Sequence, residues 1–381
     1  MPLQRIPKIL LSCGEPSGEL YGAELLRHLQ ARVPGLEGFG LGGDRLEAQG
    51  LRLVAHVRDL AVVGLLEVLS HLRRLRAIFR QLLMEVDRDR PDVAVLVDYP
   101  DFNLRLAREL RRRGVPVVYY VSPQVWAWRK GRLRTIRETV ARMLVIFPFE
   151  ESLYREAGVP VTFVGHPLVD LVQRTGDPRP FLEAHGLSPE RPVLALLPGS
   201  RSKEAAYNLP PLAAAIPLIR SARPDVQFLL ALAPSLDPTL LEGPLRGLGV
   251  SVVKDQTAAA LSAASLALVA SGTATVETAL LDTPMVVVYR ISPLTYALGR
   301  PFVQVPHFAM VNLIAGRRVV PELMQKDFTA ERVAAESLRL LTDRAATEAM
   351  RGDLARVRGL LGPPGASGRA AEVVADILRA R

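Results

Sequence analysis

The sequence is poorest in cysteine, with Cys13 alone among 381 residues. A single cysteine excludes an intrachain disulfide and any zinc or iron–sulfur site built from several cysteines. The reducing cytoplasm is the expected location of such a chain.

Long hydrophobic runs are also missing. No stretch reaches the ~18 apolar residues that a membrane-spanning helix needs. The first apolar run, residues 9–11, is shorter than the ~7–15 residues of a signal-peptide core. The longest candidate, residues 60–69, is interrupted by Glu67. We therefore expect a protein that is soluble or lies on a membrane surface.

Histidines are few and scattered. The six histidines form no His-Glu-x-x-His or similar set, so we expect no metal site and no other cofactor. A zinc knuckle, RNP aromatic residues and helix-turn-helix spacing are absent as well, and we expect no nucleic-acid partner.

Acidic residues are outnumbered by basic ones. The chain has 48 Lys and Arg against 39 Asp and Glu, which gives a net charge of +9. An excess of positive charge by itself favours an anionic partner, which can be nucleic acid, a phosphorylated metabolite or an acidic membrane surface. The alternative is that the arginine content reflects genome composition alone. With 49% hydrophobic residues the chain is globular and not disordered.

Short apolar runs alternate with segments of helical period along the whole chain. Runs rich in Val, Ile and Leu are typical of buried parallel strands. Their alternation with helices predicts a doubly wound α/β architecture. We predict strands at residues 8–12, 93–97, 115–121, 143–146, 161–164, 193–197, 226–231, 250–253, 266–270 and 285–289.

A stretch rich in glycine and proline, near residues 165–180, separates two series of strands. The length also favours two domains, since a domain has ~100–200 residues. The fold class we predict is α/β, with two Rossmann-like lobes facing a cleft. The predicted domains are 1–168 and 169–345, followed by C-terminal helices at 346–381 that can pack back on the first lobe.

The first candidate loop, Gly14-Glu15-Pro16-Ser17-Gly18, directly follows the first predicted strand. Open α/β sheets bind ligands at the carboxyl ends of their strands, and glycines let the backbone approach a ligand closely. Glu15 and Ser17 have side chains that can bind a sugar or a phosphate. The alternative is a plain turn in which Ser17 caps the helix.

A second glycine-rich segment, residues 38–43, superficially resembles a dinucleotide-binding loop. It lacks the Gly-x-Gly-x-x-Gly spacing and has no proper strand before it. We therefore expect no nicotinamide or flavin binding there.

Residues 65–86 have the apolar spacing of an amphipathic helix, with several arginines on the remaining surface. A basic amphipathic helix can lie in a membrane interface, whereas such helices more often pack their apolar side on a core. The apolar residues just before it extend the patch. The predicted membrane or acyl-chain contacts are Val62, Val63, Leu65, Leu66, Leu69 and Leu72.

Asp98 stands at the end of the predicted strand 93–97. A carboxylate at the end of a strand is where a general base is expected in an open α/β sheet. The alternative is an acid of a turn or a cap. Asp101 is expected to cap the helix that begins near Phe102.

Residues 122–129 follow another predicted strand and contain both tryptophans, Trp126 and Trp128, beside basic residues. Aromatic side chains next to cations suit stacking on a sugar or binding of nucleic acid. The alternative is packing between the lobes.

The first loop of the second strand series, Gly199-Ser200-Arg201, has the composition of an anion site. Main-chain N–H groups and the dipole of the following helix favour phosphate, and Arg201 adds a bidentate donor. The alternative is a simple turn.

A similar strand-to-helix junction is formed by Ser271, Gly272, Thr273 and Thr275. Small residues allow close contact between the helix N-terminus and a diphosphate. Glu277, expected in the first helical turn, can bind a ribose diol or can merely offset the helix dipole. Together the two loops predict a site for a sugar carried by a nucleoside diphosphate.

Taken in order, these motifs resemble the lipid-A-disaccharide synthase family. The resemblance runs over nearly the whole chain, and the linked motifs are specific, although each alone is weak. Pro16, Glu19 and Met324 depart from the usual Ala, Asp and Leu. The motifs are residues 14–18, 98–103, 122–129, 147–150, 164–168, 197–201, 271–277 and 320–325.

The resemblance implies a glycosyltransferase of the GT-B type with the nucleotide on the second lobe. The family transfers 2,3-diacylglucosamine from UDP-2,3-diacylglucosamine to 2,3-diacylglucosamine 1-phosphate. It inverts the anomeric centre, forms a β-1′,6 linkage and releases UDP. The resemblance further implies peripheral association with the inner face of the inner membrane and allows a homodimer.

The loops and the resemblance together predict Asp98 and Arg201 as catalytic residues. Glu15, Asn312 and Gln325 match family positions around the donor and the acceptor. The predicted acceptor contacts are Glu15, Ser17 and Gly18. The predicted nucleotide-sugar contacts are Gly199, Ser200, Ser271, Gly272, Thr273, Thr275, Glu277, Asn312 and Gln325.

Two other functions stay open on the sequence alone. A UDP-sugar 2-epimerase would share the nucleotide site but would have no use for the amphipathic patch. A non-enzymatic lipid-binding protein of the membrane surface would explain residues 60–80 but not two anion loops and a strand-end carboxylate.

Overall fold

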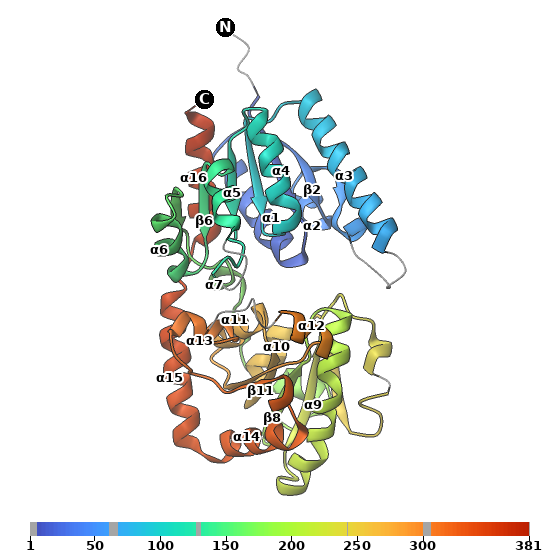
Figure 1. Cartoon of the computed structure of the whole chain (residues 1–381). Helices are drawn as coiled ribbons and strands as arrows, with labels where there is room; N and C mark the ends of the chain where they lie inside the picture. The colour runs from blue at the N-terminus through green and yellow to red at the C-terminus, as the bar shows by residue number, and fades with distance from the viewer. Residues whose placement is uncertain (1–5, 61–67, 127–130, 242, 300–305, 381) are drawn as a thin grey trace. The chain divides into compact units, whose positions relative to one another are not determined.

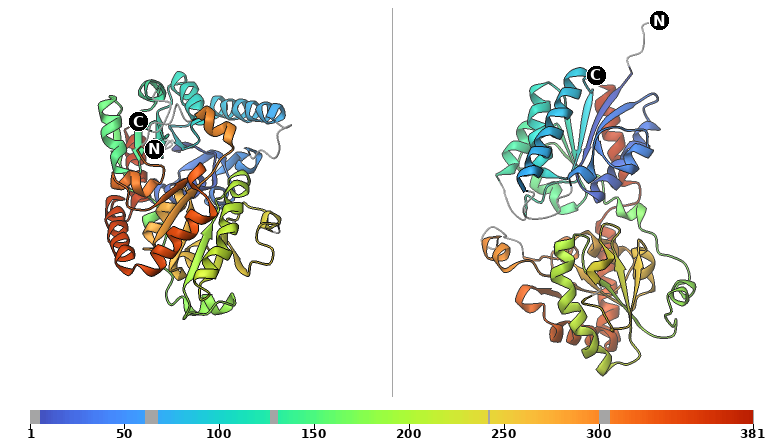
Figure 2. Two further views of the ribbon diagram at one scale, coloured as in Figure 1. Left: turned by 60° about the horizontal axis from the view of Figure 1, so that its bottom comes forward. Right: turned by 90° about the vertical axis from the view of Figure 1, so that its right-hand side faces the viewer.

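The computed structural model describes residues 6–60, 68–126, 131–241, 243–299 and 306–380. The chain divides into two compact units. Unit 1 comprises Met1–Pro167 and Gly362–Arg381, and unit 2 comprises Leu168–Leu361. Each unit is built on a parallel sheet with helices on both faces (Figures 1 and 2).

Unit 1 has a seven-stranded sheet in the order β3-β2-β1-β4-β5-β6-β7. The direction of winding therefore reverses between β1 and β4. The strands are β1 (Lys8–Cys13), β2 (Glu37–Gly42), β3 (Arg52–His56), β4 (Val93–Val97), β5 (Val117–Tyr120), β6 (Arg142–Val145) and β7 (Val161–Phe163). The helices are α1 (Pro16–Gln30), α2 (Asp44–Ala48), α3 (Val68–Arg88), α4 (Pro100–Arg112), α5 (Arg132–Thr139), α6 (Pro148–Glu156) and α16 (Ala366–Arg379).

Unit 2 has a six-stranded sheet in the order β10-β9-β8-β11-β12-β13, with the reversal between β8 and β11. The strands are β8 (Val193–Leu197), β9 (Gln227–Leu232), β10 (Val250–Lys254), β11 (Leu266–Ala270), β12 (Met285–Tyr289) and β13 (Glu322–Met324). The helices are α7 (Leu168–Leu171), α8 (Arg179–Ala184), α9 (Ser202–Ala222), α10 (Thr257–Ala263), α11 (Thr273–Leu280), α12 (Pro293–Gly299), α13 (Met310–Ala315), α14 (Ala330–Thr342) and α15 (Arg344–Leu360).

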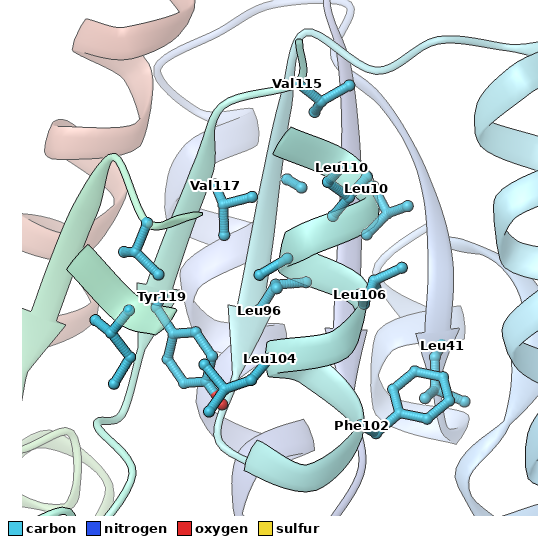
Figure 3. Packing of buried hydrophobic residues seen from close by; sticks show 14 of the residues in the cluster. Leu10, Leu41, Leu96, Phe102, Leu104, Leu106, Leu110, Val115, Val117 and Tyr119 are labelled. Atoms are coloured by element: carbon cyan, nitrogen blue, oxygen red, sulfur yellow. The ribbon is translucent and has the colours of Figure 1, made fainter. Parts of the chain in front are cut away.

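The strands predicted from buried apolar runs are confirmed. Central strands such as β4, β8 and β11 are buried at every position, which is why they consist of almost continuous Val, Leu, Ile and Ala. The core of unit 1 forms where helices cover these strands. In Figure 3, Leu106 and Leu110 of α4 face the strands that carry Leu10 and Leu96. Full burial of such side chains contributes about 1.5–3 kcal/mol each.

The glycine-rich segment 38–43 was not among the predicted strands, but most of it forms one. Residues Glu37–Gly42 are themselves strand β2, with Phe39 and Leu41 buried. A Cβ at Gly40 would lie 1.8 Å from the carbonyl oxygen of Leu11, so the glycine is needed for close approach to β1. The segment therefore serves sheet packing.

The carboxyl group of Glu19 leaves no room for a side chain at Gly43, which precedes α2. Glu19 is buried and accepts the N–H of Arg45 at 2.8 Å. A Cβ at Gly43 would lie 2.5 Å from Oε1 of Glu19. The Glu19 side chain thus anchors α2 to α1.

The last helix, α16, belongs to unit 1 and packs against α1 (Figure 1). Arg32, just after the end of α1, forms an ion pair with Glu372 of α16 at 2.9 Å. Arg369 donates a hydrogen bond of 2.8 Å to the carbonyl oxygen of Val164. Of the residues expected as C-terminal helices, those up to Leu361, including α15, belong to unit 2.

Candidate functional site

The strand order brings four of the predicted loops together in two pairs. In unit 1, β1 pairs with β4, so the loop at 14–15 lies beside the loop at 98–99. In unit 2, β8 pairs with β11, so the loop at 199–201 lies beside the loop at 271–273. Open α/β sheets bind ligands where the winding reverses. Each unit therefore has a candidate site at its own reversal point.

The main chain of Asp98 has an unusual conformation. Asp98 and Tyr99 have φ angles of 48° and 49°, which cost roughly 1–3 kcal/mol each in residues other than glycine. The N–H of Asp98 donates to the carbonyl oxygen of Tyr120 at 2.9 Å. Its own carbonyl oxygen accepts from the Tyr119 hydroxyl and from the Asn103 amide, both at 2.7 Å. These hydrogen bonds fix the backbone that carries the Asp98 carboxyl group.

Tyr99 joins the loops that follow β1 and β4. A Cβ at Gly14 would lie 2.2 Å from Cγ and Cδ1 of the Tyr99 ring, so only glycine allows this contact. Burial raises the pKa of Tyr99, and the negative charges of Glu15 and Asp101 raise it further. The ring also lies near Phe102, with centroids 5.8 Å apart. The two loops therefore pack as one group, and Glu15 lies within it.

The other predicted residues of the first loop lie on α1. Glu15 is the N-cap residue of this helix, so the alternative in which Ser17 is the cap is wrong. Ser17 is the second helical residue and is half-buried. Gly18 is buried, and a Cβ there would lie 3.6 Å from the carbonyl oxygen of Val97. Gly18 thus lies at the packing contact between α1 and β4.

Asp101 is not the cap of α4, contrary to the sequence interpretation. The helix begins at Pro100, with Tyr99 as N-cap residue. Proline is favoured at the first helical position because its φ is already helical and it has no N–H to satisfy. Asp101 lies in the first turn and forms an ion pair with Arg132.

Trp126, in the loop after β5, binds a buried carboxyl group. Its indole N–H donates to Oε1 of Glu150 at 3.2 Å, and the N–H of Phe147 donates to Oε2 at 3.3 Å. Burial raises the pKa of Glu150 to about 8, although these hydrogen bonds act in the opposite direction. Trp126 also packs edge-on against Phe149, with centroids 5.3 Å apart. Trp128 lies outside the described residues.

The same aromatic cluster extends to His166. The ring of Phe147 is parallel to that of Phe149 at 5.7 Å and lies 5.3 Å from that of His166. Tyr21 of α1 contacts His166 edge-on at 6.0 Å. Burial lowers the pKa of His166 to about 3. The cluster therefore holds a neutral imidazole in the interior of unit 1.

Arg201 is exposed at the N-terminus of α9, on a loop that is fixed from two sides. The buried Asn208 amide donates at 2.9 Å to the carbonyl oxygen just before Gly199. The Ser235 hydroxyl donates at 2.7 Å to the carbonyl oxygen of Ser200. The guanidinium group is thus presented from an ordered loop, as an anion site requires.

The main-chain N–H of Ser200 already has an acceptor. It donates to Oε2 of Glu204, in the first turn of α9, at 3.1 Å. The sequence interpretation assigned this amide to a phosphate and did not consider Glu204. A carboxylate of the protein therefore lies where the loop was expected to bind its ligand.

The loop after β11 is open at its tip. Gly272, the N-cap residue of α11, and Thr273 are exposed. The hydroxyl groups on either side of this tip form hydrogen bonds within the protein. Ser271 donates to the carbonyl oxygen of Phe308 at 2.9 Å, and Thr275 donates to the carbonyl oxygen of Gly272 at 2.8 Å. The first turn of α11 contains no acidic residue. The positive end of this helix is therefore available to an anion.

Glu277 lies in the second turn of α11, not in the first turn as expected. Interaction with a helix dipole falls off beyond the first turn, so the dipole interpretation is weakened. Burial raises the pKa of Glu277.

Two of the predicted nucleotide-sugar contacts, Gln325 and Asn312, lie close to β13 in the fold. Gln325 follows the strand with a φ of 51°, and its carbonyl oxygen accepts from Arg290 at 3.1 Å. Asn312 is buried and donates to the carbonyl oxygen of Val320 and to Oε1 of Glu322, at 3.0 and 2.7 Å. Its oxygen accepts the N–H of Val320 at 3.0 Å. The Asn312 side chain therefore positions Glu322 and the chain before β13.

The predicted membrane contacts lie at or before the start of α3. Val62, Val63, Leu65 and Leu66 lie outside the described residues, and only the main chain is described at Leu69 and Leu72. Farther along α3, Ile78, Leu82 and Val86 are buried in the core of unit 1. The core interpretation therefore holds for this later part of the helix. Its exposed residues include Arg73, Arg74, Arg76, Arg80 and Met84.

The described part of the chain contains neither a metal-binding cluster nor a helix that could span a membrane. No cluster of His, Cys, Asp and Glu side chains in this part could hold a metal ion. None of its helices combines the length and hydropathy required to cross a bilayer.

The residues that hold the loops were missed by the sequence analysis. Asn103 lies within a motif that was noted, but only the fold shows that its amide reaches the carbonyl oxygens of β1 and β4. Glu204 stands three residues after the N-cap residue Arg201, a spacing typical of a side chain that folds back on a helix N-terminus. That spacing was a usable signal. Glu150 has the same spacing from the N-cap residue Phe147.

Comparison with known proteins places the chain among close relatives. Residues 9–361 match the family model described as lipid-A-disaccharide synthetase. The chain is 46% identical over 374 residues to the lipid-A-disaccharide synthase of Myxococcus xanthus (strain DK1622), with 98% of each chain covered. It is 44% identical over 373 residues to that of Geobacter sulfurreducens, with 97% of each covered.

Solved structures at low identity share the fold. A UDP-GlcNAc 2-epimerase from Neisseria meningitidis bound to UDP-GlcNAc gives a TM-score of 0.70 at 13% identity, covering 96% of this chain and 99% of that one. CalG4, the calicheamicin glycosyltransferase, gives a TM-score of 0.61 at 18% identity, covering 99% of both. The predicted fold class, two Rossmann-like α/β domains of the GT-B type, is confirmed.

Proposed function

Since the chain belongs to the lipid-A-disaccharide synthase family, we propose that Asp98 of unit 1 and Arg201 of unit 2 carry out its transfer reaction. The protein is an inverting glycosyltransferase. It joins UDP-2,3-diacylglucosamine to 2,3-diacylglucosamine 1-phosphate through a β-1′,6 linkage and releases UDP.

Asp98 acts as the general base in this proposal. Its carboxylate takes the proton of the acceptor 6-hydroxyl as the oxygen attacks C1 of the donor sugar. The C1–oxygen bond to UDP breaks on the opposite side, so a single displacement inverts the anomeric centre. The observation that carries the proposal is the fixed backbone of Asp98, with its carbonyl oxygen bound by Tyr119 and Asn103. A base held in place adds the advantage of orientation to that of proton transfer.

Arg201 and the N-terminus of α11 stabilise the leaving UDP. As the bond to C1 breaks, negative charge grows on the diphosphate. The exposed tip at Gly272 and Thr273 offers main-chain N–H groups, and Arg201 offers a guanidinium group. Donors already oriented toward developing charge are the strongest electrostatic contribution an enzyme can make.

The remaining predicted residues have supporting roles. Glu277 holds the ribose hydroxyl groups, and Gln325, directly after β13, contacts the donor nucleotide-sugar. Glu15 binds the acceptor, supported by its place beside Tyr99 in the loop group of Asp98. Gly199, Ser200, Ser271 and Thr275 shape the two nucleotide loops.

Unit 1 docks on the inner face of the inner membrane through the start of α3. The exposed arginines of this helix would face anionic lipid, and each basic residue near such a surface contributes about 1 kcal/mol. The apolar residues 62–72 would contact acyl chains. The protein acts from the cytoplasmic side.

The function is tested by measuring UDP release from UDP-2,3-diacylglucosamine with and without 2,3-diacylglucosamine 1-phosphate. Release that depends on the acceptor, with formation of the disaccharide, supports the proposal. Conversion of UDP-GlcNAc to its C2 epimer would instead identify an epimerase. Vesicle binding without any binding of UDP would identify a lipid-binding protein.

A further inference from the structure

Glu204 occupies the loop that was expected to receive a phosphate. Its carboxylate folds back from the first turn of α9 and accepts the N–H of Ser200 at 3.1 Å. Gly199 has a φ of 121°, and a Cβ there would lie 2.4 Å from Oε2 of Glu204. The absence of a side chain at position 199 therefore gives the carboxylate its room.

The loop does not depend on Glu204 for its path. Asn208 holds the carbonyl oxygen before Gly199 at 2.9 Å, and Ser235 holds the carbonyl oxygen of Ser200 at 2.7 Å. Both contacts involve carbonyl groups, whereas Glu204 binds an N–H group. An acceptor on this N–H can therefore be exchanged for another while the carbonyl contacts remain.

Among the described residues, Arg201 and Tyr289 interact electrostatically with the carboxylate. Arg201, on its own loop, attracts it, and Tyr289 at the end of β12 lies close enough to interact with both. Burial raises the pKa of Glu204, while the N–H bonds and Arg201 lower it. Glu204 is thus a partly buried anion that uses the same donors as a diphosphate would.

We propose that Glu204 is an internal anion that competes with the diphosphate for the Ser200 amide and Arg201, and so promotes release of UDP. This inference rests on the proposed nucleotide site of unit 2. Phosphate oxygens displace the carboxylate when the donor binds. After transfer, the carboxylate returns to the same donors as UDP leaves.

The N-terminus of α11 has no such competitor. Its first turn lacks an acidic residue, and Gly272 and Thr273 are exposed. The diphosphate therefore keeps one uncontested anchor at α11 and meets competition only at the α9 loop. This division keeps the nucleotide bound during transfer without making its release slow.

The test is calorimetric titration of UDP into wild type, Glu204→Gln and the control Glu190→Gln at several pH values, from below the ordinary glutamate pKa of ~4.3 to mildly alkaline pH. Glutamine keeps an oxygen for the Ser200 N–H but carries no charge. We expect Glu204→Gln to bind UDP roughly tenfold more tightly than wild type at the alkaline end. The control, an exposed acid of the same unit, should bind like wild type.

The pH dependence separates competition from a structural role. As the pH falls, Glu204 becomes neutral in wild type, so the affinity ratio of the two proteins should approach one. Protonation of UDP itself affects both proteins equally and cancels in the ratio. Glu204→Ala should also bind UDP more tightly than wild type, and the dissociation rate of UDP should fall in both variants.

Equal or weaker binding of UDP by a folded Glu204→Gln variant, or a ratio that does not change with pH, would overturn the inference. Suppose that wild type binds UDP and that Arg201→Ala weakens this binding. If Glu204→Gln then fails to bind UDP more tightly, the nucleotide site stands and only the role of Glu204 is refuted. If wild type binds no UDP, the proposed nucleotide site fails with it.

Discussion

The side-chain amide of Asn103 donates a hydrogen bond of 2.7 Å to the main-chain carbonyl oxygen of Asp98. The same amide lies 3.2 Å from the carbonyl oxygen of Val97 and 3.3 Å from that of Ser12. The Ser12 hydroxyl in turn donates to Oδ1 of Asn103 at 2.8 Å. One buried side chain thus links the ends of β1 and β4 and holds the left-handed turn at Asp98.

Replacing Asn103 by Leu should damage both stability and turnover. The change keeps the volume, but it removes one of the two donors to the Asp98 carbonyl oxygen and leaves the Ser12 hydroxyl without its acceptor. Each buried group that stays unsatisfied costs about 1–3 kcal/mol. We expect a lower melting temperature and a fall in kcat that exceeds any change in UDP affinity. Arg105→Leu, at an exposed position of the same helix, is the control. Wild-type kcat in a folded Asn103→Leu protein would show that Asp98 does not need this contact.

A methyl group at Gly14 should displace the turn from the other side. The new Cβ would lie 2.2 Å from the Tyr99 ring, so Tyr99 and the adjacent Asp98 would have to move. A misplacement of about 1 Å can cost ~100-fold in rate, and we expect Gly14→Ala to lose at least about tenfold in kcat. Gly176→Ala is the matched control, since nothing lies within 4 Å of a Cβ there. Equal kcat in the two variants would contradict the packing argument.

Glu150 should make unit 1 less stable as the pH rises. Its pKa is about 8 in the folded protein against 4.5 normally, because the buried carboxyl group resists ionisation. Between these values the folded state binds a proton that the unfolded state has lost. Stability is therefore fully kept below pH 4.5 and falls toward pH 8, by up to about 1.4 kcal/mol per pH unit.

Glu150→Gln should remove this loss while keeping an oxygen for Trp126 and Phe147. In denaturant unfolding at several pH values, the free energy of unfolding of the variant, relative to that of wild type, should increase from acid to mildly alkaline pH. Glu156→Gln, exposed at the end of the same helix, should follow wild type. Parallel curves for Glu150→Gln and wild type would mean that Glu150 does not titrate as described.

The membrane proposal predicts two separable contributions to vesicle binding. Arg73, Arg76 and Arg80 are exposed on α3, so changing them to Gln should weaken sedimentation with anionic vesicles and reduce its salt dependence. Changing Leu65, Leu69 and Leu72 to Ser should weaken binding at all salt concentrations, because apolar contact is not screened. Undiminished binding by both folded variants would assign this segment to the core alone.

The sequence predicted the strands best where burial on both faces demands continuous apolar residues, as at β4 and β8. It missed β2, because the close approach of β1 requires glycine at position 40, and glycine is atypical of strands. It also missed β3, none of whose residues is fully buried, and β13, which has only three residues. The ends of the strands could be located from the sequence. Which strand ends lie next to each other could not, because that depends on the pairing of β1 with β4 and of β8 with β11.

Part of the candidate site could also be predicted from the sequence. The loops at the ends of the strands carry three exposed or partly exposed residues of the site, namely Asp98, Arg201 and Gly272. The sequence could predict them because the end of a buried strand is marked by the end of its apolar run. The contacts of Asn103 with Asp98 and of Asn312 with Glu322 depend on side-chain direction within the fold. The competition between Glu204 and an anion likewise became visible only with the hydrogen bond to Ser200.

The most direct measurement of the central claim is the turnover of Asp98→Asn compared with its affinity for UDP. Loss of a general base costs ~10²–10⁴-fold in rate, so kcat should fall by that amount while UDP, bound by unit 2, keeps its wild-type affinity. Asp101→Asn, three residues later and paired with Arg132, should retain most of its activity. A folded Asp98→Asn enzyme with near-normal kcat would contradict the account.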